Sequence, residues 1–283
     1  MAVVRAARRG AVDAEAEQPF ASLRPERDVC DLVDRRLSVR VCGVPPYPSV
    51  ISLDFYFFHV EKCAGMSLRR AIYTVFRERY TDDQMHIPGS TRPGDQTIRD
   101  HADEEGYFEQ VKVIADHSNP GELAALLGTE VEIRFSVTAL RHPVDRALSH
   151  FHYFYGAGGS LLEVSPERLE RFMTRHGNLQ TTRLSNETES LPDAMAALGG
   201  MDAILLVEDY HRSIELLNRV NPFGVRFDPS VVDNVTETDD GADYKDLYSD
   251  DFRHSLERFC TNDLALHAEA RRLFDEMCAR AGV

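Results

Sequence analysis

Residues 59–68 combine the side-chain types that bind an anion, in the order His-Val-Glu-Lys-Cys-Ala-Gly-Met-Ser-Leu. Ala64 and Gly65 are small enough for the backbone to approach a ligand, Lys62 offers a positive charge, and Ser67 offers a hydroxyl where a helix would start. Lys62 is one of three lysines in a chain that otherwise uses arginine. The segment predicts an anion-binding loop, although a tight turn with a solvated lysine would have the same composition.

A second segment, residues 137–151, places Arg141 after an apolar run and Ser149 eight residues later. An arginine at the end of a strand can hold a phosphate through its planar fork of donors. Pro143 can open a helix without losing a hydrogen bond, and Ser149 would lie two turns along the same helix. Each residue alone is also compatible with a structural role, Arg141 in an ion pair and Ser149 on a helix surface.

The elements that must position these residues alternate between strand and helix. Short apolar runs at 54–60, 111–115, 133–140 and 203–207 are typical of strands buried on both faces. Segments with helical spacing follow them at 68–76, 120–127, 143–154 and 210–219, and the residues 166–198 and 249–281 also look helical. This alternation predicts an α/β fold with a central parallel sheet flanked by helices and binding loops at the carboxyl ends of the strands.

The chain before the first strand has a different character. Residues 1–20 run from an arginine cluster into an Ala/Glu stretch without apolar periodicity, and 26–41 could form a short amphipathic helix. The proline-rich run at 45–48 would stop that helix. We therefore expect a partly disordered N-terminal extension over residues 1–48 and one main domain over 49–283.

The composition is that of a globular protein with an acidic surface. Of 283 residues, 43% are hydrophobic and 28% charged, and the net charge is −15. That charge repels nucleic acid and polysulfated glycans, so we expect neither as a partner. No apolar run is long enough to span a membrane, and the N-terminus lacks the apolar region of a signal peptide.

The five cysteines are widely spaced and contain no CxxC pair. This pattern favours neither a disulfide framework nor a metal site and is typical of a reducing compartment. We expect a cytoplasmic protein without a bound metal.

The loop at 61–68 resembles the 5′-phosphosulfate loop of sulfotransferases that use 3′-phosphoadenosine 5′-phosphosulfate (PAPS), in the bacterial type of their carbohydrate (family 2) branch. The usual form is Pro-Lys-Thr-Gly/Ala-Gly-Thr-Ser-Leu. The matching positions are Lys62, Ala64, Gly65, Ser67 and Leu68. The positions that depart are Glu61 for the proline, Cys63 for the first threonine and Met66 for the second.

Residues 137–151 resemble the 3′-phosphate element of the same family, a strand ending in Leu-Arg-Asp-Pro and a helix with Arg and Ser at fixed spacing. Arg141 and Ser149 match, and His142 replaces the aspartate. Weaker resemblances follow at 113–117, where the family places a catalytic histidine, at 178–184, at 205–210, and at 233–236, the loop that closes over the nucleotide. Together they cover residues 54–275.

The resemblance implies a three-layer P-loop-like fold and a transferase that moves the sulfuryl group of PAPS to a hydroxyl. Lys62 would stabilise the leaving phosphate, and His117 would be the general base, with His59 and His142 as alternatives. The implied nucleotide-binding residues are Lys62, Cys63, Ala64, Gly65, Met66, Ser67, Leu68, Arg141, Ser149, Asn234 and Thr236.

Two other functions remain open. A P-loop small-molecule kinase is less favoured because the GxxxxGK[ST] loop is absent. A nucleotide-binding module without catalysis is suggested by the departures at Glu61, Cys63 and Met66. For a sulfotransferase, carbohydrate sulfation is the family's activity, and we expect the acceptor hydroxyl on a sugar, a glycosylated metabolite or a lipid. The sequence makes no prediction of oligomeric state.

Overall fold

The computed structural model describes residues 50–88, 98–101, 104, 106–155, 165–231 and 248–283. Its elements lie in one compact unit, Pro45–Val283. The expected extension over residues 1–48, including the possible helix at 26–41, lies outside the described residues. The same holds for Asn234 and Thr236 of the expected nucleotide-closing loop.

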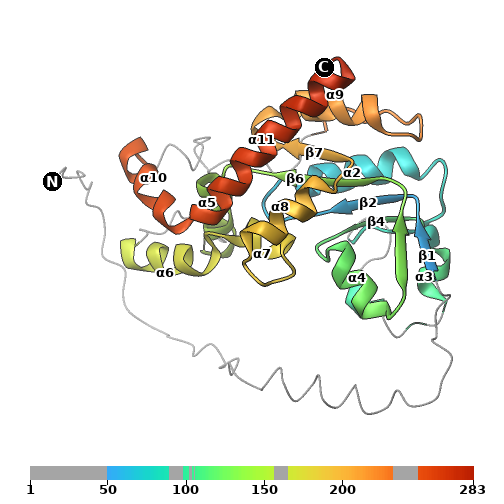
Figure 1. Ribbon diagram of the computed structural model, residues 1–283, viewed down its shortest axis with the longest axis horizontal. Helices are drawn as coiled ribbons and strands as arrows, with labels where there is room; N and C mark the ends of the chain where they lie inside the picture. The colour runs from blue at the N-terminus through green and yellow to red at the C-terminus, as the bar shows by residue number, and fades with distance from the viewer. Residues whose placement is uncertain (1–49, 89–97, 102–103, 105, 156–164, 232–247) are drawn as a thin grey trace, which may run out of the picture. The chain divides into compact units, whose positions relative to one another are not determined.

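A five-stranded parallel sheet forms the centre of this unit, which confirms the predicted α/β class (Figure 1). Its strand order is β3-β4-β2-β6-β7. The bounds are β2 (Phe55–Phe58), β3 (Met85–His86), β4 (Val113–Asp116), β6 (Ser136–Leu140) and β7 (Ala203–Leu206). Apart from the two-residue β3, each strand falls within or overlaps one of the apolar runs, because a strand buried on both faces carries apolar side chains at successive positions.

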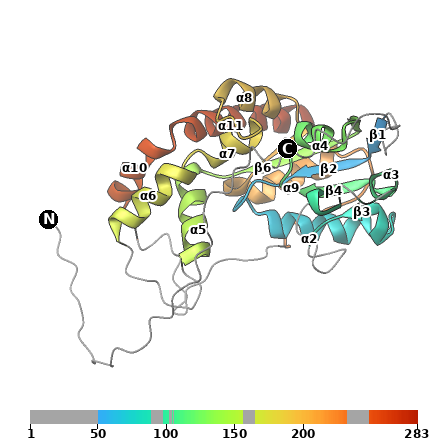
Figure 2. The same ribbon diagram turned by 90° about the horizontal axis from the view of Figure 1, so that it is seen from below.

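Helices cover both faces of the sheet. Figure 2 shows α2 (Gly65–Phe76) below the sheet, and α7 (Leu179–Leu184), α8 (Leu191–Gly199) and α11 (Thr261–Ala281) above it. The other helices are α3 (Tyr107–Gln110), α4 (Pro120–Leu127), α5 (Pro143–Tyr155), α6 (Pro166–His176), α9 (Tyr210–Val220) and α10 (Asp250–Leu256). Several begin at a polar cap followed by proline, as at Asn119, whose side chain accepts the Glu122 N–H at 3.0 Å.

The structure differs from the sequence prediction in several places. Of the predicted strand 133–140, β6 covers 136–140, whereas Ile133 ends another strand, β5 (Glu130–Ile133), which pairs only with β1 (Val50–Leu53) in a separate two-stranded sheet. The Arg134 N–H, which donates to the Leu53 carbonyl at 2.9 Å, ends that pairing before β6 begins. The short strand β3 is also not among the predicted strands. The segments 166–198 and 249–281 are also broken into shorter helices, near Gly177 and near Cys260.

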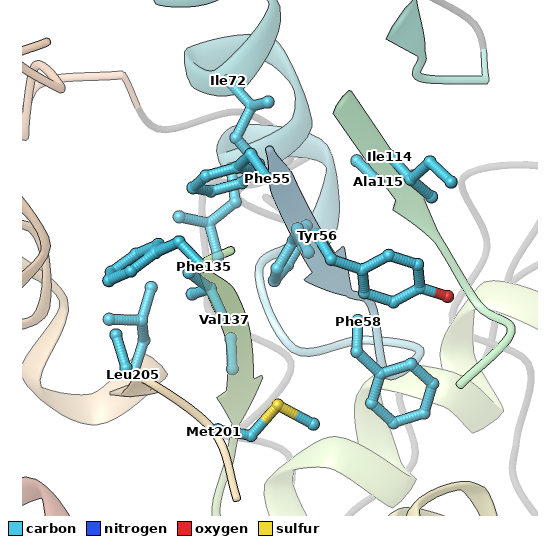
Figure 3. Packing of buried hydrophobic residues seen from close by; sticks show 14 of the residues in the cluster. Phe55, Tyr56, Phe58, Ile72, Ile114, Ala115, Phe135, Val137, Met201 and Leu205 are labelled. Carbon is cyan, nitrogen blue, oxygen red and sulfur yellow. The ribbon is translucent and has the colours of Figure 1, made fainter. Parts of the chain in front are cut away.

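The core is built around β2, whose four side chains are all buried. Figure 3 shows Phe55 and Tyr56 leaving the strand on opposite sides, with Phe55 beside Ile72 of α2. The rings of Phe55 and Phe76 lie 5.0 Å apart, and the Tyr56 hydroxyl donates to the Ser118 carbonyl. β2 is thereby fixed against α2 on one side and against the segment after β4 on the other.

The path of the chain identifies where a ligand fits this sheet. From β2 the chain passes through α2 to β3 and β4 on one side, whereas β6 and β7 lie on the other side. Ligands of open α/β sheets bind outside the carboxyl ends of the strands at such a reversal of direction. The segments leaving these ends are residues 59–64 after β2 and Arg141 after β6.

Candidate functional site

The loop after β2 has an uncommon backbone. Lys62 and Ala64 adopt left-handed conformations, with φ of 66° and 56°, which side-chain-bearing residues rarely occupy. Ala64 is the N-cap of α2 and makes no side-chain cap, and no acidic residue lies in the first turn. The start of α2 therefore presents unpaired backbone donors and its positive dipole end.

His59 packs directly against Gly65 at the start of α2. A Cβ added at Gly65 would lie 1.5 Å from His59 Nε2, so this position requires glycine. The His59 side chain is 6% exposed, and its Nδ1 is buried without a hydrogen-bond partner. Burial, together with the positive charges of His117, Arg69 and Lys62, holds the pKa of His59 well below its usual value. A neutral imidazole with an unsatisfied polar atom thus lies under the loop.

Lys62 and Arg141, which the sequence places in separate motifs, meet at this site. Arg141 donates from Nη1 to the Lys62 carbonyl at 3.4 Å. The Lys62 ammonium lies 4.3 Å from the centre of the Tyr153 ring and has no carboxylate within 4 Å in the part of the chain that the structure describes. Burial and the charge of Arg141 lower the pKa of Lys62. Two cations at close range, one of them half-buried, form a site for an anion.

The other expected nucleotide-binding residues differ in their exposure. Ser149 lies on α5 and is buried. The structure places Cys63 and Leu68 in the core, Ser67 buried in the first turn of α2, and Met66 on the surface. Burial raises the pKa of Cys63 to about 12, so the residue is a thiol and not a nucleophile.

Glu61, a carboxylate beside an anion loop, is paired with Arg183 of α7. Arg183 Nε donates to the two carboxylate oxygens at 3.0 and 3.2 Å, and Nη2 donates to Oε1 as well. Burial works to raise the pKa of Glu61, but the hydrogen bonds and charge of Arg183 outweigh it and lower the pKa. Glu61 therefore serves as an anchor for the loop and does not repel an anion there.

His117 follows β4 and is held in one tautomer. Its Nδ1 lies 2.7 Å from the His59 carbonyl oxygen, which can only accept, so Nδ1 carries the proton and Nε2 keeps its lone pair. The ring lies 4.2 Å from the His59 ring and its side chain is 30% exposed. A partly exposed imidazole with an open Nε2 has the arrangement of a general base.

Asp116 fixes the backbone at His117. Its Oδ1 accepts the His117 N–H at 2.5 Å, and its Oδ2 accepts the Ile98 N–H at 2.6 Å and lies 3.5 Å from His86 Nε2. Burial works to raise the pKa of Asp116, but His86 and the two backbone donors lower it. The carboxylate thus stabilises the end of β4.

The other two candidate bases are less suited to the role. His59 is almost fully buried. His142 lies in a separate cluster, where its N–H donates to Glu208 and its ring lies 5.7 Å from the His267 ring. Of the three imidazoles, His117 is the one with an open nitrogen next to the loop of Lys62.

Sequence reasoning missed Gln180 as a member of the site, although the segment 178–184 was noted. Gln180 is fully buried, and its Oε1 accepts the Arg141 N–H at 3.0 Å and lies 3.5 Å from Cys63 Sγ. Asp263 in turn accepts the N–H groups of Gln180 and Thr181 at 3.1 and 2.7 Å. The available signal was a glutamine in a segment that the sequence predicts to be helical, since a buried polar side chain needs hydrogen-bond partners.

Within the described ranges, no group of three His, Cys, Asp or Glu side chains could hold a metal ion. None of the described helices has the length and apolar character needed to cross a membrane. A comparison with models of known protein families found no match. A comparison with curated proteins found no relative.

Proposed function

We propose that this protein is a PAPS-dependent sulfotransferase that moves a sulfuryl group to an acceptor hydroxyl. One observation carries the proposal: Lys62 and Arg141, 79 residues apart in the chain, lie in contact at the point where the order of the strands reverses. PAPS carries two separate anionic groups, a 5′-phosphosulfate and a 3′-phosphate. Two cationic elements at one ligand-binding edge fit such a molecule.

The donor would bind with its 5′-phosphosulfate at the loop after β2. Lys62 and the backbone N–H groups at the start of α2 would hold the phosphosulfate. Arg141 and Ser149 would hold the 3′-phosphate. Strands on both sides of β2, with helices on both faces, support the finer proposal of a three-layer P-loop-like fold.

The transfer step uses charges that this site supplies. The acceptor oxygen forms a bond to sulfur while the bond from sulfur to the bridging 5′-phosphate oxygen breaks. Negative charge grows on that bridging oxygen, and Lys62 would stabilise it more in the transition state than in the ground state. The acceptor proton would pass to Nε2 of His117. This nitrogen carries no hydrogen in the neutral ring because Nδ1 holds the proton that is donated to the His59 carbonyl.

Transfer of a radiolabelled sulfuryl group from PAPS to a mixture of hydroxyl acceptors tests this function. We expect Lys62→Ala to lower kcat more than donor affinity, because the charge that Lys62 meets grows during the reaction. Lys112→Ala is the matched control, since Lys112 donates to the Ser52 carbonyl at 3.3 Å away from the loop. A Lys62→Ala variant that changes only the donor KM would contradict the role of this lysine.

A further inference from the structure

Exposed apolar side chains gather beside Lys62. Among the described residues the exposed large hydrophobic side chains are Met66, Tyr153 and Phe154, at 53%, 67% and 56% exposure. The Tyr153 ring receives the Lys62 ammonium at 4.3 Å, Phe154 is its neighbour on α5, and Met66 lies in the first turn of α2, four residues after Lys62. We call Tyr153 and Phe154, whose rings lie 5.8 Å apart, the apolar rim. Single exposed apolar residues are common, but this grouping at one loop indicates a binding surface.

The residue behind the rim is a neutral hydrogen-bond donor. The His150 ring lies 4.9 Å from the Phe154 ring, and Arg146 Nη1 lies 3.4 Å from His150 Nδ1. A guanidinium can only donate, so Nδ1 accepts and the His150 proton is on Nε2. Burial, with the charge of Arg146, lowers the pKa of His150 to about 4. His150 itself is therefore uncharged at neutral pH.

We propose that the apolar rim binds the hydrocarbon part of an amphiphilic acceptor, a molecule whose reactive hydroxyl is attached to an alkyl chain or hydrocarbon ring system. This inference rests on the proposed sulfuryl transfer. The Tyr153 ring lies 4.3 Å from the Lys62 ammonium, so a molecule that packs on this ring would lie next to the proposed sulfuryl position. The net charge of −15 and the neutral His150 disfavour a polyanionic acceptor.

A chain-length series measures the contribution of the rim. Methyl, butyl, hexyl and octyl β-glucopyranosides, below their micelle concentrations, are titrated into the full chain with and without 3′-phosphoadenosine 5′-phosphate (PAP), the desulfated donor. We expect affinity to rise by about two- to fourfold per added methylene, as for partial to full burial of the chain. The double variant Tyr153→Ser/Phe154→Ser should lose most of this dependence.

Two further variants separate binding from structural damage. Tyr153→Phe keeps the ring and should keep the dependence on chain length. Tyr73→Ser is the matched control, because Tyr73 lies further along α2 with its hydroxyl 3.4 Å from Asp82. A thermal melt of each variant reports whether it is folded.

An affinity that does not change with chain length, or that changes equally in wild type and the double variant, overturns the inference. So does rim-dependent binding to phosphatidylcholine vesicles without binding of single amphiphiles, which would assign the rim to a membrane surface. Calorimetry with PAP on the same samples distinguishes a failure of the rim proposal from a failure of the proposed function. Normal PAP binding with no chain-length effect rejects the rim alone, whereas absent PAP binding rejects the proposed function.

Discussion

Gln180 holds Arg141 by both of its backbone polar groups. The side-chain oxygen accepts the Arg141 N–H at 3.0 Å, and the side-chain amide donates to the Arg141 carbonyl at 2.9 Å. The same oxygen lies 3.5 Å from Cys63 Sγ in the loop after β2. A single buried amide thereby links the two segments that the proposed donor would contact, and α7 becomes part of the site.

Replacing Gln180 by leucine should destabilise the protein and weaken PAP binding together. The buried N–H and carbonyl of Arg141 would lose their partner, at a cost of about 1–3 kcal/mol for each unsatisfied group. Thermal denaturation and PAP calorimetry measure the two effects, and Gln110→Leu, at an exposed position of α3, is the control. If PAP affinity stayed the same while stability fell, Gln180 would support the fold without positioning Arg141.

Gly65→Ala should force the His59 ring out of its position. The added Cβ would lie 1.5 Å from His59 Nε2, and overpacking of a filled site costs about 1–3 kcal/mol. The double variant Gly65→Ala/His59→Ala should recover part of the lost stability, since the ring is gone. Gly199→Ala, where a Cβ meets nothing, should change little. Denaturant unfolding measures the wild type, both single variants, the double variant and Gly199→Ala, and additive effects of the Gly65 and His59 substitutions would show that the contact does not exist.

Stability should fall between pH 4.5 and pH 2 in part because of Glu208. Burial works to raise its pKa, but His267 and the His142 N–H lower it from 4.5 to about 2. A carboxyl whose pKa is lower in the folded state stabilises the fold above the unfolded value and loses that contribution as pH falls through the folded value. The contribution is at most about 3 kcal/mol.

Glu208→Gln should therefore reduce the loss of stability on acidification, as measured by denaturant unfolding at several pH values. Asp251→Asn, at an exposed position of α10, is the control. An unchanged acid dependence in Glu208→Gln would contradict the assigned role of this carboxylate.

His117→Ala should lower kcat by about 10²-fold or more and leave PAP affinity nearly unchanged, because a general base contacts the acceptor proton and not the nucleotide. His211→Ala, an exposed position on α9, is the control. A His117→Ala variant that keeps the wild-type kcat would assign the base to His59 or His142.

The fold could be predicted where the sequence signal is local. The apolar run at Phe55–Phe58 identifies a buried strand because every position faces the core. β1 and β5 were not predicted, since β5 is only half-buried and its pairing depends on a segment 80 residues away. The break at Arg134 has no turn residues to mark it.

The residues of the candidate site also divide into those with a local sequence signal and those that depend on contacts between distant segments. Lys62, Arg141 and His117 could be chosen from their position after predicted strands. The pairing of Glu61 with Arg183 spans 122 residues, and that of Gln180 with Arg141 spans 39, so neither has a sequence pattern of its own. The contact of His59 with Gly65 depends on the direction of a side chain within a loop, which spacing does not determine.

Calorimetric titration with PAP, ADP and AMP tests most directly whether Lys62 and Arg141 form a site for two anionic groups. Because ADP and AMP leave the Arg141 and Ser149 position empty, and a charge-assisted hydrogen bond contributes about 1.5–3 kcal/mol, we expect PAP to bind about tenfold tighter or more. Arg141→Ala should remove that preference while the protein stays folded. Equal affinities for the three nucleotides in the wild-type protein would contradict the assignment of the site.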